Sequence, residues 1–192
     1  MSWLDNLIKT NSVQKYAYII KRFQDADDIS ADKLFQKRYN GFFRIRRNPE
    51  WQRQYYAMIQ HYKQTNTVPD YKTILQELYK RTNRVEKSFA SKALHILNHD
   101  LPILDSVVLG NFNLQTRLGS NCSPQARLAE VCDIYERLKN KIYEYRDSNE
   151  GEQRIKEFRA FVESLPGNED FDKDIARNIS DTKIIDFYFW SK

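Results

Sequence analysis

The sequence predicts an all-α protein that folds as one domain. Apolar residues recur at steps of three and four along most of the 192-residue chain, which is the period of an amphipathic helix. Glycine and proline, the residues that most disfavour helix interiors, number only five each. No stretch shows the alternation of apolar and polar residues that is typical of a half-buried strand. We therefore expect eight to ten helices joined by short loops, with a sizeable core over residues 1–192.

The expected helices follow one another along the chain. Apolar faces at helical spacing mark residues 13–23, 51–62 and 74–79, and a further helix is expected over residues 88–97. The longest periodic run is Pro124–Arg146. The next, Glu152–Leu165, ends at the stop signal Pro166-Gly167, and the last, Asp181–Ser191, begins at a cap formed by Ser180 or Asp181. Loops are expected between these segments, including residues 40–41, 112–124, 147–151 and 166–172.

The amino-acid composition restricts the classes of protein to which this chain can belong. Hydrophobic residues make up 41% of the chain and aromatic residues 14%, which argues against disorder. The formal net charge of +5 is compatible with a nucleic-acid partner without identifying one. The sequence shows neither a secretory signal nor an apolar run long enough to cross a membrane, so we expect a cytoplasmic monomer without a membrane partner. Cys122 and Cys132 are too far apart for a Cys-x-x-Cys site, and we expect no metal and no cofactor.

The most informative segment is Ser88–Leu109. An apolar helix ends near Leu97, a polar turn follows, and Leu101-Pro102-Ile103-Leu104 leads to Asp105 and a second helix. An ionised carboxylate among apolar residues is costly to bury, so this aspartate needs a reason to be there. It can cap the helix that starts at Ser106, or it can be a carboxylate kept ionised by the helix dipole at the mouth of a pocket.

This segment resembles the helix-hairpin-helix DNA glycosylase superfamily over residues 80–113. In that family a hairpin leads into a helix, and an apolar loop with a proline precedes a catalytic aspartate and a small hydroxyl residue. The resemblance implies that Asp105 is the catalytic aspartate and Ser106 its neighbour. It also implies a two-lobed helical body with the active-site cleft between the lobes. The chain departs from the family at the hairpin, where Asn83-Arg84-Val85-Glu86 replaces the usual Gly-x-Gly turn.

Two basic clusters suggest a surface that faces nucleic acid. Five of the eleven residues in Lys37–Arg47 are basic, three are aromatic and none is acidic. Basic side chains bind phosphates without sequence preference, and aromatic rings can stack on bases or wedge between them. The alternative is an ordinary solvated run beside core aromatics. A second cluster lies at the hairpin, and the expected DNA contacts from both are Arg44, Arg46, Arg47, Arg84, Lys87, Ser88, Ser91 and Lys92.

The implied reaction is hydrolysis of an N-glycosidic bond in double-stranded DNA carrying a damaged or modified base. One carboxylate suffices for this monofunctional route, which we favour. A route with strand cleavage needs an amine that attacks the sugar. Lys87 lies 18 residues before Asp105, a spacing that resembles bifunctional relatives, and Lys92 is its competitor. Lys87 is otherwise a phosphate contact or a solvated lysine.

Aromatic residues supply the candidates for a base pocket or a wedge. These are Tyr39, Phe42 and Phe43 in the first basic run and Phe187 and Trp190 in the C-terminal segment. Core packing is the competing interpretation for the C-terminal pair. His95 and His99 have a spacing that can hold a metal on one helix face, but the sequence offers no third ligand beside them.

Three functions are thus weighed. The leading one is a compact DNA glycosylase. A possible substrate is a phage-modified cytosine such as glucosylated hydroxymethylcytosine, and removal of that base would make the protein an antiviral enzyme. The second is a catalytically silent helix-hairpin-helix DNA-binding module, which the altered hairpin favours. The third is a helical protein-interaction domain in which the basic runs are only solvated.

Overall fold

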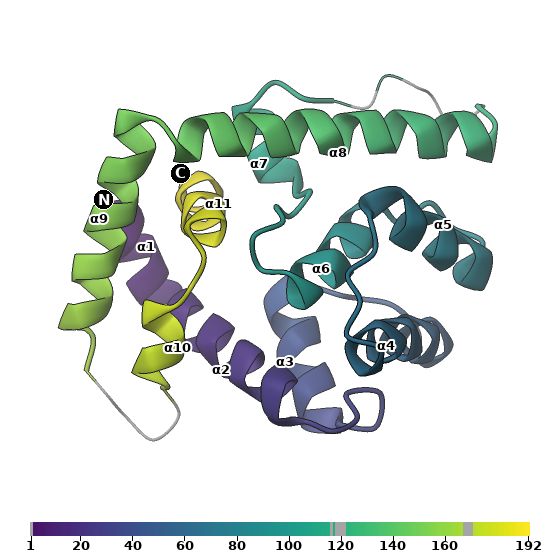
Figure 1. Ribbon diagram of the computed structural model, residues 1–192, viewed down its shortest axis with the longest axis horizontal. Coiled ribbons are helices and arrows are strands. Elements are labelled where there is room, and N and C mark those ends of the chain that lie inside the picture. Colours follow the sequence, from purple (N-terminus) through teal and green to yellow (C-terminus); the bar gives the residue numbers. More distant parts are fainter. Residues whose placement is uncertain (1, 116, 118–121, 167–170) are drawn as a thin grey trace.

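The computed structural model describes residues 2–115, 117, 122–166 and 171–192, and these residues form eleven helices (Figure 1). The helices are α1 Trp3–Thr10, α2 Ser12–Asp25, α3 Lys33–Phe43, α4 Pro49–Gln64, α5 Tyr71–Thr82, α6 Lys87–Leu97, α7 Ser106–Asn111, α8 Pro124–Arg146, α9 Asn149–Ser164, α10 Lys173–Arg177 and α11 Asp181–Ser191. The expected all-α class is confirmed. The count exceeds the expected eight to ten because α1, α7 and α10 have only eight, six and five residues, and helices this short carry little periodic signal.

Local side chains start most of these helices. Ser2 and Asp5 form a reciprocal capping box at the first turn of α1. Asn48 and Ser123 cap α4 and α8, each followed by a proline at the first helical position. Ser180 caps α11 by accepting a hydrogen bond from the Lys183 amide, which confirms one of the two expected caps.

One expected loop is wrong. Residues 40–41 belong to α3, which continues to Phe43 and ends at Arg44 in the left-handed conformation, with φ of 54°. A Cβ added at Gly41 would meet nothing within 4 Å, so this glycine lies on an open helix face and does not mark a turn. Burial of the aromatic rings before and after it outweighs the modest cost of a glycine inside a helix.

The connection between α8 and α9 is tighter than the expected loop over residues 147–151. Helix α9 already begins at Asn149, and Ser148 caps it through the Gly151 amide. A Cβ at Gly151 would lie 2.0 Å from the Tyr145 carbonyl oxygen, so the close approach requires glycine here. Helix α9 ends at Ser164 with Leu165 as its C-cap, and Gly167 of the expected stop signal lies outside the described residues.

The helices fall into two groups along the longest helix, α8. Helices α4, α5 and α6 gather beside one end of α8, and α1, α9, α10 and α11 gather at the other (Figure 1). Helices α2 and α3 pack against each other and connect the groups. The buried apolar residues nevertheless form a single cluster that runs through all of these elements. Helix α7 packs on α11, so the segment after α6 reaches from one group to the other.

Buried tyrosines tie the first group together. The Tyr39 and Tyr55 hydroxyls lie 3.1 Å apart in the core. Tyr39 donates a hydrogen bond to the Lys92 carbonyl at 2.9 Å, and Tyr55 donates one to the Phe89 carbonyl at 3.0 Å. A buried hydroxyl without a partner would be costly, so these bonds to the backbone of α6 fix how α3, α4 and α6 pack. The fold thereby sets the position of α6.

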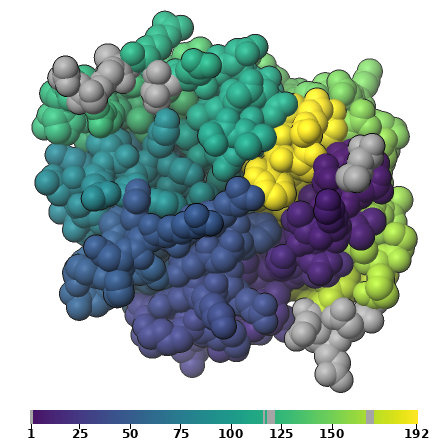
Figure 2. All heavy atoms as spheres, turned by 180° about the vertical axis from the view of Figure 1, so that it is seen from behind, coloured from purple at the N-terminus to yellow at the C-terminus, as the bar shows by residue number. Residues whose placement is uncertain are grey.

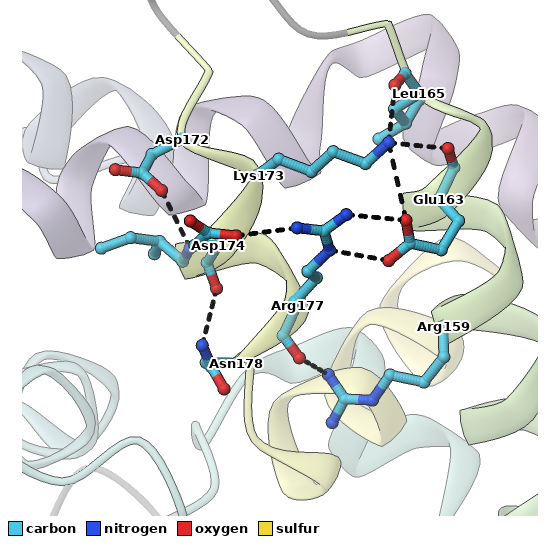
Figure 3. A network of polar contacts seen from close by, with 9 residues as sticks. Arg159, Glu163, Leu165, Asp172, Lys173, Asp174, Arg177 and Asn178 are labelled. Atoms are coloured by element: carbon cyan, nitrogen blue, oxygen red, sulfur yellow. Dashed lines mark hydrogen bonds and ion pairs between the residues drawn. The ribbon is translucent and has the colours of Figure 1, made fainter.

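Surface ion pairs orient α10 against α9 (Figure 3). Arg177 on α10 contacts Glu163 on α9 at 2.8 Å and Asp174 at 2.8 Å. Lys173 donates to the Glu163 carbonyl, and Arg159 donates to the Arg177 carbonyl. Because the charged groups in this network are partly or largely exposed, solvent screens their attraction, and the pairs orient α10 more than they stabilise it. Over the described residues, every helix is too short or too polar to cross a membrane.

Candidate active site

The described residues enclose a cleft of about 960 Å³, which we call the main cleft. Residues from α2, α3, α6, α7 and α11 line it, so its walls come from both helix groups and from the helices between them. In Figure 2 the C-terminal helix, in yellow, meets the N-terminal segment in purple and the segment around α7 in teal. Six of the lining residues are basic and two are acidic.

The loop before α7 places Asp105 in this cleft. Pro102, Ile103 and Leu104 are buried, and the Leu104 amide donates a hydrogen bond to the Ser91 hydroxyl at 2.9 Å. Asp105 is partly exposed, and its Oδ1 accepts a hydrogen bond from the Val107 amide at 2.9 Å. The expected helix cap is therefore confirmed. Because the cap uses only Oδ1 of a residue that lines the cleft, capping and a second role do not exclude each other.

Ser91, one of the expected DNA contacts, lies in the core and is not accessible from the surface. It is fully buried, and its hydroxyl donates to the Ser88 carbonyl at 2.9 Å while accepting from the Leu104 amide. Its role is to hold the apolar loop against α6. Ser88, one turn earlier, is partly exposed and does line the main cleft.

Lys92 lines the main cleft rather than an outer surface. Its side chain is buried, and Nζ donates a hydrogen bond to the Phe43 carbonyl at 3.0 Å. Burial lowers the pKa of Lys92, while the charges of Asp105 and Asp186 act in the opposite direction. Lys92 can therefore meet DNA, as we expected, only through a group that enters the cleft.

A buried ion pair lies at the floor of the main cleft. Lys183 Nζ contacts Asp186 Oδ2 at 2.6 Å, and the two side chains are 3% and 8% exposed. Lys183 Nζ also lies 4.3 Å from the centre of the Phe187 ring and 5.0 Å from that of Tyr16. Burial raises the pKa of Asp186, and the attraction of Lys183 only partly offsets this.

The sequence analysis missed this pair. The available signal was a lysine and an aspartate three residues apart in a C-terminal helix whose other residues from Ile184 to Trp190 are apolar or aromatic. A buried pair of this kind is weak evidence for stability, because desolvation of two charges cancels much of their attraction. Its position against the cleft suggests a role in binding.

Gln14 on α2 was also missed, and no pattern in the sequence points to it. It lines the main cleft, and its Oε1 atom is buried without a hydrogen-bond partner among the described residues. Buried polar atoms in folded proteins almost always have partners, so this acceptor is suited to a donor on a bound molecule.

Aromatic rings form much of the remaining wall. Phe42, Phe43, Phe187 and Trp190 all line the main cleft, as the interpretation of a base pocket requires. The Arg44 guanidinium lies 5.8 Å from the centre of the Trp190 ring, which places one expected DNA contact at the same site. Tyr39 is the exception: it is fully buried and bonded to the Lys92 carbonyl, so it can be neither a wedge nor a stacking platform.

The other predicted contacts lie outside the main cleft. Lys87 begins α6, is partly exposed, and accepts a hydrogen bond from Tyr71 through its carbonyl; it is not among the residues that line the cleft. Lys92, and not Lys87, therefore shares the lining of the main cleft with Asp105. Arg46, Arg47 and Arg84 gather around a second, smaller cavity.

Two hydrogen bonds hold the buried His95 ring in place. Its Nδ1 lies 2.7 Å from the Leu101 carbonyl, which can only accept, so Nδ1 donates and Nε2 accepts from the Tyr16 hydroxyl at 2.8 Å. A neutral ring with its proton on Nδ1 satisfies both contacts. Burial is the main cause that lowers the pKa of His95 well below its ordinary value, and the charge of Lys183 adds to it.

We expect the free energy of unfolding to fall as the pH drops below about 6.5. There the unfolded chain takes up a proton at His95 and the folded protein does not, so His95 contributes a slope of up to about 1.4 kcal/mol per pH unit. Burial also lowers the pKa of His99, which adds to the slope in the same direction. Urea unfolding between pH 7 and pH 5 measures this slope. His95→Gln should show a shallower dependence, whereas His61→Gln, at an exposed position, should match the wild type. Equal slopes in His95→Gln and wild type would contradict the assignment.

The described residues contain no group of three histidine, cysteine, aspartate or glutamate side chains that could hold a metal. His95 and His99 instead contact the Tyr16 hydroxyl. Comparison of the chain with protein-family models, curated proteins and solved structures found no match.

Proposed function

We propose that this protein is a DNA glycosylase that removes a flipped-out damaged or modified base and leaves an abasic site. The observation that carries the proposal is the placement of Asp105: a carboxylate lines a cleft that also has aromatic walls and six basic residues. The four exposed basic residues of this lining, Lys15, Lys37, Arg38 and Arg44, can attract the DNA backbone, and the aromatic rings can hold a base removed from its stack.

The reaction follows from these groups. As the bond between C1′ of the sugar and the base nitrogen breaks, its electron pair leaves with the base and the sugar becomes positively charged. The Asp105 carboxylate stabilises this charge and orients a water molecule. The water oxygen bonds to C1′, and one water proton ends on the departing base. No redox partner is needed, since bond cleavage and addition of water balance.

The lining also suggests a substrate class. A volume of about 960 Å³ is at the upper end for a pocket that binds a small molecule, which leaves room for a base with a bulky substituent. Beyond the aromatic walls, the junction of α1 and α2 contributes the polar residues Thr10, Asn11, Ser12 and Gln14. Hydroxyl and amide groups suit a substituent rich in hydroxyls. We favour a modified cytosine such as glucosylated hydroxymethylcytosine of phage DNA.

The test is base release from defined duplexes. The protein is incubated with unmodified DNA, with DNA carrying oxidised or alkylated bases, and with glucosylated phage DNA, and alkali then cleaves any abasic site. Cleavage after alkali with one of the altered duplexes supports the proposal. DNA binding without cleavage on any of them would favour the silent DNA-binding module, for which the capping role of Asp105 alone would be a sufficient explanation.

Borohydride should trap no covalent complex with the substrate. Lys87 is not among the residues that line the main cleft, and the Lys92 amine is held by the Phe43 carbonyl, so neither is free to form an imine at the sugar. The measurement is a gel assay with borohydride during turnover. A trapped complex that disappears in Lys92→Ala would instead establish a lyase with Lys92 as the nucleophile. A complex that disappears only in Lys87→Ala would favour the assignment made from the sequence spacing.

A further inference from the structure

A second cavity, of about 350 Å³, opens between the start of α4 and the end of α5. We call it the arginine cavity, because Arg46, Arg47, Arg81 and Arg84 all line it. Its position is separate from the main cleft: the two sets of lining residues have no member in common. The proposed base release does not use it.

Two of the four guanidinium groups are already neutralised. Arg47 makes a bidentate pair with Glu86, with distances of 3.1 and 2.9 Å, and Arg81 pairs with Glu77 at 2.6 Å. Arg46 and Arg84 are exposed and have no ion pair with any described residue. The cavity therefore carries surplus positive charge at its edge.

Glu50 is the one carboxylate among the lining residues. It pairs with Arg53 at 2.5 Å and accepts a hydrogen bond from Gln54 at 3.1 Å. Its charge is thus shared with Arg53, which does not line the cavity, and it does not neutralise Arg46 or Arg84.

An unsatisfied donor in the same wall points independently to a bound acceptor. Trp51 lines the arginine cavity, is 6% exposed, and its indole Nε1 has no hydrogen-bond partner among the described residues. Indole nitrogen can only donate. The ring is stacked on Tyr55 at 4.9 Å and packed edge-on against Phe89 at 5.1 Å, which holds it in place. Because Nε1 is buried, an acceptor reaches it only when neighbouring side chains of the cavity shift.

We propose that the arginine cavity binds a phosphate group. Guanidinium groups present paired N–H donors that match the geometry of phosphate oxygens, and the charge of the anion balances Arg46 and Arg84. The Trp51 N–H supplies a further donor to one oxygen. The phosphate can belong to the nucleic-acid backbone, to a strand terminus or to the free ion; the recognition chemistry is the same for each.

The first experiment uses inorganic phosphate alone, so that it does not depend on base release. Titration of the whole protein is followed by calorimetry and by tryptophan fluorescence, with sodium chloride at matched ionic strength as the reference. Arg46→Gln/Arg84→Gln should weaken phosphate binding at least tenfold. Lys72→Gln/Lys80→Gln removes two charges from exposed positions of α5 outside the cavity and should leave it unchanged.

Trp51→Phe tests the donor separately. It keeps an aromatic ring between Tyr55 and Phe89 and removes the N–H, and it should weaken phosphate binding several-fold while the thermal midpoint of unfolding stays close to that of the wild type or rises. Equal phosphate affinity in wild type and Arg46→Gln/Arg84→Gln would overturn the proposal. So would an equal loss in the Lys72→Gln/Lys80→Gln control, because binding would then reflect net charge alone.

DNA binding by the same variants identifies the source of the phosphate. Duplexes with and without a 5′-phosphate are compared for wild type and Arg46→Gln/Arg84→Gln. An equal loss of affinity for both duplexes assigns the site to a backbone phosphate, and a loss confined to the phosphorylated duplex assigns it to a strand end. If the double variant loses phosphate binding but keeps its affinity for both duplexes, the ligand is the free ion.

Discussion

Replacing Asp105 with asparagine should lower the rate of base release by about 10²–10⁴-fold while the fold and DNA binding are retained. Asparagine caps a helix as well as aspartate does, so the hydrogen bond from the Val107 amide can persist. The amide carries no negative charge, however, and cannot stabilise a positively charged sugar. The measurement is single-turnover base release together with DNA affinity and the free energy of unfolding.

The matched control is Asp70→Asn. Asp70 caps α5 through the Thr73 amide in the same way that Asp105 caps α7, but it does not line the main cleft. The chemical change and the type of cap are the same, so Asp70→Asn should release base at the wild-type rate. Undiminished activity in Asp105→Asn would remove the catalytic role and leave Asp105 as a structural cap.

Replacing Asp186 with alanine should destabilise the protein by about 3–5 kcal/mol at neutral pH. The change leaves the Lys183 ammonium buried among aromatic rings without its partner, and an unpaired buried charge is among the most costly defects in a folded protein. Urea unfolding at pH 7 measures the effect. Ser12→Ala provides a comparison. It removes a hydroxyl from another residue that lines the main cleft, but it leaves no charge unpaired.

A double variant separates stability from binding. Lys183→Met/Asp186→Leu replaces the pair with apolar side chains and should recover most or all of the lost stability, since such replacements are often neutral or stabilising. If the pair serves substrate binding, the recovered protein should still release base poorly. A stable double variant with wild-type activity would show that the pair has no part in the site.

Much of the fold could be predicted from the sequence. Long amphipathic segments such as Pro124–Arg146 report their helical period directly, and caps such as Ser180 mark where helices begin. The failures occurred where local signals are weak or compete. Gly41 suggested a turn, but the burial of neighbouring aromatic rings continues α3 past it. Helices as short as α10 depend on contacts with α9 that the local sequence does not encode.

The candidate site could likewise be predicted only in part from the sequence. Asp105 and the aromatic residues Phe42, Phe187 and Trp190 could be chosen from the sequence, because a carboxylate in an apolar loop, rings beside basic residues and a C-terminal segment dense in aromatic residues are visible as patterns. Their convergence on one cleft could not, since they come from α3, α7 and α11. Ser91 and Tyr39 are the opposite case. The sequence suggested that both residues contact DNA, but both are fully buried.

The sequence by itself determined that this chain is helical, where its principal helices lie, and that Asp105 opens a helix after an apolar loop. Those properties depend on neighbours three or four residues apart. Only the tertiary structure decided that Lys92 rather than Lys87 lies in the cleft, that Lys183 and Asp186 form its floor, and that four arginines surround a second cavity. Each of these depends on how distant helices pack, because burial and charge at a site are set by side chains far apart in the chain.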